Sequence, residues 1–242
     1  MYSLFAYWIC FIFFKKNNNK LYLLLAVFFI LSAIITSARI VVLLSIVSVI
    51  ISLVSTIKSN SKKVAALILF FLVGIMAITN VPSLKQKFHQ FLELEKIGFD
   101  KNNYRSISSR LGKIEASVAV IKNNLWLGTG TGDAKDELVK EYKKMKFTMG
   151  YKNKYNAHNQ YLDNLVRNGI IGGMISLLAI YFFPFYISIR RKEKLLLTFI
   201  IIIAVVSLTE SILDRHKGIT FYVFFVSLML SSIFQNKLHS ED

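Results

Sequence analysis

Long apolar blocks dominate this chain, and short basic or polar connections separate them. A transmembrane helix needs about 20 predominantly apolar residues, although shorter ones occur. We expect seven blocks to be membrane-spanning helices: Tyr2–Phe14, Leu21–Ile35, Ile40–Ile57, Val64–Asn80, Ile170–Ile189, Leu195–Leu213 and Ile219–Phe234. The pattern therefore predicts an all-α, polytopic integral membrane protein with about seven transmembrane helices.

One long segment, residues 81–169, interrupts the apolar blocks, and we expect it to form a helical loop on one side of the membrane. This divides the chain into three parts. Residues 1–80 hold four N-terminal spans, residues 81–169 form the loop with amphipathic helices, and residues 170–242 hold three C-terminal spans.

The second half of this loop has a clear helical repeat. Its apolar residues recur at steps of three and four, which predicts an amphipathic helix with one apolar face: Leu111, Ile114, Val118, Ile121 and Leu125. Either Ser108 or Ser109 is suited to cap its start. Further on, we expect Trp126, Phe147 and Tyr151 to lie at the level of the lipid headgroups.

The basic residues of the short connections gather on one side of this layout. They are Lys15, Lys16, Lys20, Lys58, Lys62, Lys63, Arg190, Arg191, Lys192, Lys194 and Lys237. The short connections on the other side hold only Arg39, Arg215 and Lys217. Because short loops rich in Lys and Arg stay cytoplasmic, the N-terminus and the long loop are predicted to lie outside.

Composition supports the membrane class and excludes several others. The chain is 54% hydrophobic and has a formal net charge of +16. Such a charge would suggest nucleic acid in a soluble protein, but no nucleic-acid motif accompanies it. The single cysteine, Cys10, excludes a framework of internal disulfides. No spacing typical of a zinc site, an EF-hand or a Ser-His-Asp triad is present.

Candidate chemistry centres on the segment Asn156–Gly169, which leads directly into an apolar block. We expect a short helix with Asn156 as its N-cap, on which His158 is suited to general-base catalysis near neutral pH. Asn159 and Tyr161 would supply supporting hydrogen bonds. The alternative is a capping or interfacial histidine bonded to backbone.

Two arginines on the outer side are candidates for anion binding. Arg39 lies in a tight outer turn, where a charge usually has a partner or ligand; the alternative is a surface arginine that snorkels. Arg110 lies in the first turn of the amphipathic helix, where the helix dipole disfavours a cation and a bound anion would compensate. Its alternative is a solvated loop arginine.

A third polar group follows the sixth apolar block: Glu210 with Asp214, Arg215 and His216. Glu210 is expected about one turn inside the outer end of the span, where a carboxylate needs a partner. An ion pair that holds helices together is an equally good interpretation. The glycines Gly128, Gly130 and Gly132 imitate a phosphate-binding loop, but they follow a helix and are better interpreted as a turn.

Together these features resemble the O-antigen ligase and polymerase superfamily over about Leu21 to Phe234. Ser37-Ala38-Arg39 is similar to the family's Ser-Arg pair at the outer end of a helix, with one residue inserted. Arg110 and its helix, ending in Trp126-Leu127-Gly128-Thr129-Gly130, resemble the family's Arg, helix and "lGxG" turn. The most specific match is Ala157-His158-Asn159-Gln160-Tyr161-Leu162, which resembles the His-Asn-x-Tyr-Leu signature.

The resemblance implies a metal-independent, inverting glycosyltransferase of the bacterial inner membrane, with its active site on the periplasmic side. Its donor would be a glycan on undecaprenyl pyrophosphate, its acceptor lipid A-core or another glycan, and no cofactor is implied. Arg39 and Arg110 would bind the pyrophosphate and His158 would deprotonate the acceptor. Asn159, Tyr161, Glu210 and Arg215 would bind substrate. Family members usually have more transmembrane helices, so this chain is expected to correspond to the C-terminal part of the fold.

Three alternatives are also compatible with the sequence. A polymerase would extend the glycan on its lipid carrier by the same chemistry. The sequence does not identify the acceptor, which is what separates the two activities. A transporter or lipid flippase could use Arg39, Glu210 and Arg215 as a charged pathway, but the centres of the predicted spans are apolar. A non-catalytic membrane scaffold is the third.

Overall fold

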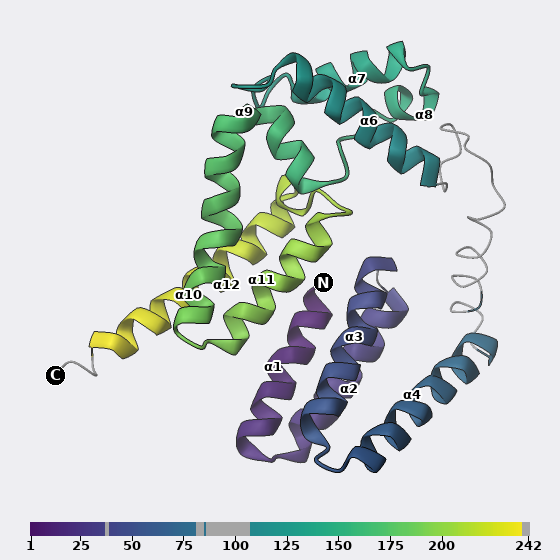
Figure 1. The fold of residues 1–242 in the computed structure, drawn as a ribbon, viewed down its shortest axis with the longest axis vertical. Helices are drawn as coiled ribbons and strands as arrows, with labels where there is room; N and C mark the ends of the chain where they lie inside the picture. Colours follow the sequence, from purple (N-terminus) through teal and green to yellow (C-terminus); the bar gives the residue numbers. More distant parts are fainter. Residues whose placement is uncertain (37–38, 81–84, 86–106, 239–242) are drawn as a thin grey trace. The chain divides into compact units, whose positions relative to one another are not determined.

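The structure is a computed structural model that describes residues 1–36, 39–80, 85 and 107–238 (Figure 1). Within these ranges every regular element is a helix and no strand occurs, so the predicted all-α class is confirmed. The chain divides into two compact units, Met1–Ile97 and Gly98–Asp242, and each is described by itself. The predicted three-part division at residues 80 and 169 stays a prediction.

The described part of the first unit holds four helices: α1 (Tyr2–Asn17), α2 (Lys20–Thr36), α3 (Arg39–Thr56) and α4 (Asn60–Asn80). Polar side chains connect α1 to a row of buried serines on α3. The Tyr7 hydroxyl donates to Ser52 Oγ, and the Trp8 indole donates to Ser48 Oγ at 3.0 Å. Small residues that allow close approach and hydrogen bonds between helices are typical of helix packing within a membrane.

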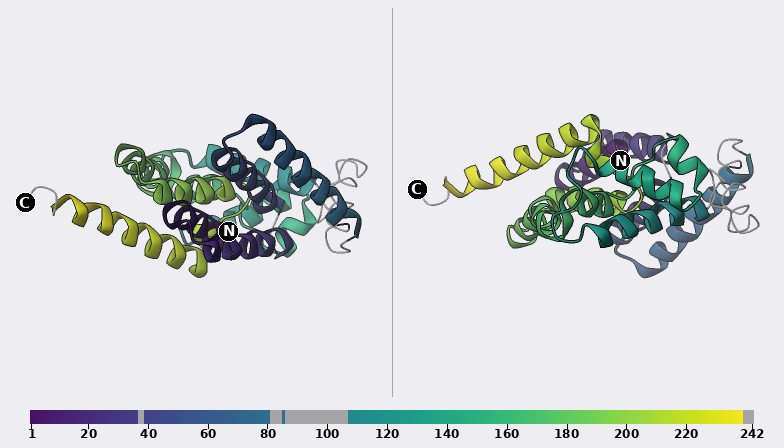
Figure 2. Two further views of the ribbon diagram at one scale, coloured as in Figure 1. Left: turned by 90° about the horizontal axis from the view of Figure 1, so that it is seen from below. Right: turned by 90° about the horizontal axis from the view of Figure 1, so that it is seen from above.

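The second unit holds the remaining elements: α6 (Ile107–Asn123), α7 (Ala134–Lys144), α8 (Thr148–Lys152), α9 (Gln160–Leu177), the π-helix η2 (Leu178–Phe182), α10 (Phe183–Arg190), α11 (Lys194–Ser207), the 3₁₀ turn η3 (Ile212–Asp214) and α12 (His216–Leu238). In Figure 1 the helices α6, α7 and α8 gather at one end of α9, and we call these three helices the helical cap. Figure 2 shows α12 running at an angle to α9, α10 and α11.

Each of the seven predicted apolar blocks contains a helix in the structure. Among the described residues, three helical stretches are long and apolar enough to cross a membrane: 39–56, 160–190 and 216–235. The apolar helices at 20–35 and 194–207 are shorter. The chain is therefore a multi-pass membrane protein, and membrane crossing by the other predicted blocks stays a prediction.

One boundary was predicted wrongly. The sixth block was expected to continue to Leu213, but α11 ends at Ser207. The residues that follow turn away from the helix and form the connection to α12. Glu210 therefore lies in this connection, beyond the end of α11 and not one turn inside it.

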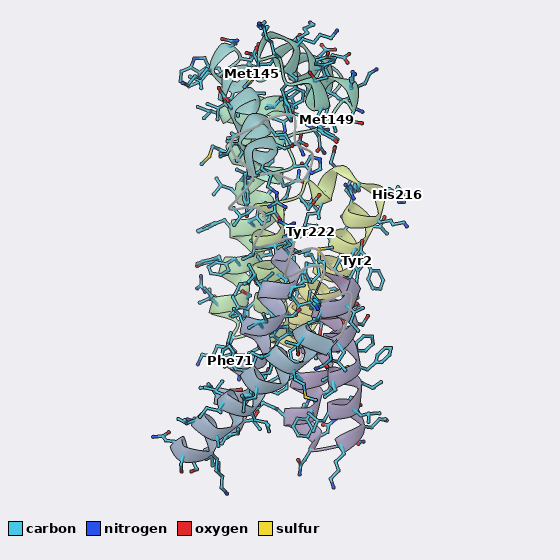
Figure 3. The ribbon with its side chains drawn as sticks, turned by 90° about the vertical axis from the view of Figure 1, so that its right-hand side faces the viewer. Tyr2, Phe71, Met145, Met149, His216 and Tyr222 are labelled. Atoms are coloured by element: carbon cyan, nitrogen blue, oxygen red, sulfur yellow. The ribbon has the colours of Figure 1, made fainter. Side chains whose placement is uncertain are left out.

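A π-helix interrupts the long stretch of α9 and α10 just before Pro184. Proline has no N–H, so the carbonyl of Ile180, four residues earlier, loses its usual helical partner. The hydroxyl of Tyr222 on α12, a residue labelled in Figure 3, donates to this carbonyl. A side chain from a neighbouring helix thus satisfies the freed backbone group, as the interior of a membrane requires.

The helical cap has a hydrophobic core of its own, to which α9 contributes: Ala116, Val120, Ala134, Leu138, Tyr142, Phe147 and Val166. Met145 and Met149 pack against it at the α7–α8 end (Figure 3). Phe147 is fully buried in this core, so its predicted place among the lipid headgroups is wrong. Trp126, in contrast, is 65% exposed and stays a candidate for the membrane interface.

The predicted amphipathic helix is present as α6, but the face that is buried lies opposite the predicted apolar face. Leu111, Ile114 and Val118 of the predicted apolar face are 43%, 39% and 37% exposed. The buried side of α6 instead carries Ala116 and Ser117, whose small size lets α7 approach closely. The helix also begins at Ile107, so Ser108 and Ser109 lie within it and not at its N-cap.

Candidate functional site

His158 lies in a tight turn immediately before α9. Its backbone has φ = 48°, and its N–H donates to the side-chain oxygen of Asn156 at 3.2 Å. The N-cap of α9 is Asn159, whose side-chain oxygen accepts from the N–H groups of Tyr161 and Leu162 at 3.0 and 3.1 Å. The predicted cap at Asn156 is therefore wrong. His158 precedes the helix because Asn159 starts it.

The same signature residues connect α9 to the end of α11. The Asn159 amide donates to the Leu208 carbonyl at 3.1 Å, and the Tyr161 hydroxyl donates to the Ala204 carbonyl at 2.9 Å. Between them, Gln160 accepts from the N–H of Leu213 at 2.7 Å. These bonds hold the connection that carries Glu210 against the His158 turn.

Glu210 lies between His158 and Arg215. Its Oε2 is 3.6 Å from Nδ1 of His158 and 3.8 Å from the Arg215 guanidinium. The neighbouring His158 contributes most to holding the pKa of this carboxyl below its usual value, while partial burial opposes the shift. Arg215 and Arg110 lower the same pKa further. The carboxylate is therefore ionised and can orient the imidazole.

Helix α6 adds two cations to this group. Arg110 lies in its first turn with an exposed side chain, and it is close enough to lower the pKa of Glu210. Lys113, on the next turn, is only 8% exposed. Its Nζ lies 4.3 Å from the ring centroid of Tyr155, and the Tyr155 ring meets the His158 ring edge to face at 5.7 Å between centroids.

A second ionic group connects the same segments of the chain. Arg167 of α9 pairs with Asp163, one turn earlier, at 3.1 Å and also with Asp214 in η3. Asp214 in turn accepts from the Asn156 amide at 3.2 Å. The Asp163 side chain is almost fully buried. The hydrogen bonds that Asp214 accepts from Arg167 and Asn156 join α9, the His158 turn and η3.

The glycine-rich stretch is a turn, as predicted, and it contacts α9 directly. Gly169 has φ = 62° and interrupts the helix. The N–H groups of Ile170 and Ile171 donate to the carbonyls of Leu125 and Trp126, at 2.8 and 3.2 Å. In exchange, the N–H groups of Thr129 and Gly130 donate to the carbonyls of Val166 and Arg167, both at 2.9 Å. Two N–H groups and two carbonyls at the kink thus find partners in the turn.

An apolar groove of about 450 Å³ begins beside Tyr161 and follows α9, η2, α10 and α11. It is open, and its lining carries no exposed polar surface. Its walls include Met174, Tyr181, Ile200 and Val205. A groove of this character suits a hydrocarbon chain and not a polar ligand.

The structure thus brings together Arg110, His158, Glu210 and Arg215 of the residues selected from sequence. Asn159 and Tyr161 lie beside them with their polar groups bonded to backbone. Arg39 belongs to the first unit, where it begins α3 with an exposed side chain. Its neighbours Ser37 and Ala38 lie outside the described residues.

Four contributors were missed from sequence: Lys113, Tyr155, Asp163 and Arg167. Asp163 and Arg167 are spaced as a helical ion pair, which is a usable signal. The sequence has no comparable signal for Lys113 or Tyr155. One is a lysine among many and the other a loop tyrosine, and only the burial of Lys113 against the Tyr155 ring shows that they belong to the site.

A family model described as O-antigen ligase matches residues 23–177 of the chain. The match runs from α2 to the end of α9 and includes Arg39, Arg110 and His158, but it ends before Glu210 and Arg215. Comparison with curated proteins and with solved structures gives no significant match.

Proposed function

The chain belongs to the O-antigen ligase family, and we therefore propose that it is a membrane glycosyltransferase. It transfers a glycan from undecaprenyl pyrophosphate to lipid A-core at the periplasmic face of the bacterial inner membrane. The observation that carries this proposal is the His158–Glu210 pair, with Nδ1 and Oε2 3.6 Å apart, set among cations. A base oriented by a carboxylate beside an anion-binding surface suits transfer from a pyrophosphate.

The cations supply the site for the donor. Arg110 is close to Glu210 and exposed, so its guanidinium is free to bind phosphate oxygens with several donors. Arg39 is the second predicted phosphate ligand. The apolar groove that begins at Tyr161 supports a polyprenyl tail as the lipid part of the donor.

The chemical step is a direct displacement at the anomeric carbon. Nδ1 of His158 faces Glu210, which leaves Nε2 to accept the proton of the acceptor hydroxyl. The new bond joins the acceptor oxygen to the anomeric carbon. The bond from that carbon to the pyrophosphate oxygen breaks, and the electron pair leaves with the pyrophosphate. The arginines stabilise the charge that develops there, and the attack from the opposite face inverts the carbon.

Asn159 and Tyr161 have a positioning role in this proposal. Both of their side chains are bonded to the end of α11 and its connection, at Leu208 and Ala204. They keep His158 and Glu210 at a constant separation. Their predicted contact with the substrate stays a prediction.

Complementation of a strain that lacks the protein tests the assignment. We expect His158→Ala and Arg110→Ala each to abolish glycan transfer, with an unchanged amount of protein in the membrane fraction. His216→Ala, at the exposed start of α12, and Lys122→Ala, on the exposed side of α6, are matched controls that should transfer normally. Wild-type transfer by either site variant would overturn the assignment.

The same strain distinguishes the two acceptors. Lipid A-core that carries no glycan in the absence of the protein indicates a ligase. Core that carries a single repeat unit would instead show that the protein is a polymerase, because an intact ligase would still attach unpolymerised units.

A further inference from the structure

Lys113 is a buried cation that has no role in the reaction proposed above. Its side chain is 8% exposed, and its Nζ rests 4.3 Å from the centre of the Tyr155 ring. Among the residues that the structure describes, no carboxylate lies within ion-pair distance of Nζ. Burial of an ammonium group without a carboxylate partner is costly, so its position requires an explanation.

The groups that surround Lys113 come from three elements. Arg110 lies one turn earlier on α6, Tyr155 comes from the connection before α9 and contacts the His158 ring, and Glu210 comes from the connection after α11. Burial first, and the charge of Arg110 second, lower the pKa of Lys113 to about 8, against the influence of Glu210. Arg110, Lys113 and Arg215 together outnumber the single carboxylate of Glu210.

We propose that Lys113 is a further donor-binding residue, whose ammonium group binds a pyrophosphate oxygen beside Arg110 while the Tyr155 ring holds it next to the His158 turn. This inference rests on the proposed function. A cation–π contact alone is worth about 0.5 to 2 kcal/mol, which is small against the cost of the burial. A phosphate oxygen would supply the missing counter-charge.

The arrangement has a consequence for pH dependence. Only the charged ammonium binds the anion, so above pH 8 the empty protein must take up a proton when the ligand binds. Affinity for a pyrophosphate should be constant below pH 8 and weaken above it, approaching about tenfold per pH unit. An arginine at this position would stay charged throughout this range.

The experiment measures binding of farnesyl pyrophosphate to the full chain in lipid nanodiscs at pH 7, 8 and 9. The wild type should lose affinity between pH 8 and 9. Lys113→Met should bind roughly tenfold more weakly at pH 7 and show no further loss at pH 9. Lys113→Arg should bind normally at pH 7 and keep its affinity at pH 9. Lys122→Met, on the exposed side of the same helix, should match the wild type.

The outcomes separate this inference from the function on which it depends. If Arg110→Ala weakens binding while Lys113→Met behaves as the wild type, Lys113 is not a donor ligand and the proposed function stands. A Lys113→Met variant that is weaker but keeps the pH dependence of the wild type shows a packing role only, and also overturns the inference. If the wild type does not bind the probe, the pyrophosphate site itself is wrong.

Discussion

At the scale of single residues, Glu210 connects His158 to the neighbouring cations. It is the one carboxylate within ion-pair distance of His158 in the described part of the chain, and it also faces Arg215. Its pKa lies below the usual value, chiefly because of His158, so it stays charged at neutral pH. In the proposed reaction, a charged partner at Nδ1 would orient the imidazole and stabilise the imidazolium that forms when the acceptor loses its proton.

This role predicts the effect of removing the charge. Glu210→Gln should lower the rate of transfer by roughly 100-fold, because the glutamine amide cannot stabilise the imidazolium. The measurement is the rate with purified protein and lipid-linked donor. Glu137→Gln, which removes a carboxylate from an exposed pair on α7, is the control. A full rate in the Glu210 variant would show that the pair has only a structural role.

The residue types of the site were predictable in part. Arg110 and His158 were selected because their chemistry suits phosphate binding and proton transfer, and the structure places both beside Glu210. Glu210 itself was expected inside a helix, where an ion pair between helices explained it equally well. Only its position beyond the end of α11 places it next to the His158 turn.

At the scale of elements, the turn after α6 and the kink in α9 form one structure. Gly128 in the turn and Gly169 in the kink both have positive φ, and each lies against the backbone of the other segment. A Cβ on Gly169 would lie 2.4 Å from the Trp126 carbonyl, and one on Gly128 would lie 2.4 Å from the Gly169 nitrogen. This contact attaches the helix that carries Arg110 to the helix that follows His158.

Alanine substitution tests this contact. Gly128→Ala and Gly169→Ala should each destabilise the protein by at least about 1–3 kcal/mol, because strain at positive φ adds to a backbone clash. Thermal unfolding in detergent measures the change. Gly132→Ala is the matched control, since its Cβ would meet nothing within 4 Å. Equal melting temperatures for Gly128→Ala and Gly132→Ala would contradict the description of the contact.

At the scale of the whole molecule, the distribution of Lys and Arg predicts on which side of the membrane each connection lies. The α10–α11 connection follows Arg190, carries Arg191 and Lys192, and should be cytoplasmic. The helical cap carries Arg110 and precedes the His158 turn, and it should be periplasmic. The proposed reaction depends on this orientation, because its acceptor is on the outer face.

Cysteine labelling tests the orientation. In a Cys10→Ala background, a membrane-impermeant maleimide should label Lys122→Cys in intact spheroplasts. It should label Arg191→Cys only after the membrane is permeabilised, although both positions are exposed on the protein surface. Labelling in the reverse order would place the site in the cytoplasm and contradict the proposed location.

The sequence by itself determined the class of this protein, its helices and the family to which it belongs. These properties follow from local patterns: the length of apolar blocks, the placement of basic residues, and short motifs such as the one around His158. Such patterns do not depend on which segments meet in space. The interpretation of the glycines as a turn was correct for the same reason.

Only the tertiary structure decided which side chains act together. It paired His158 with Glu210, buried Lys113 against Tyr155, turned the opposite face of α6 inward and joined Gly128 to Gly169. Each of these contacts joins residues on different elements or depends on which side of a helix is covered. That choice is made by packing between elements, which no local pattern records.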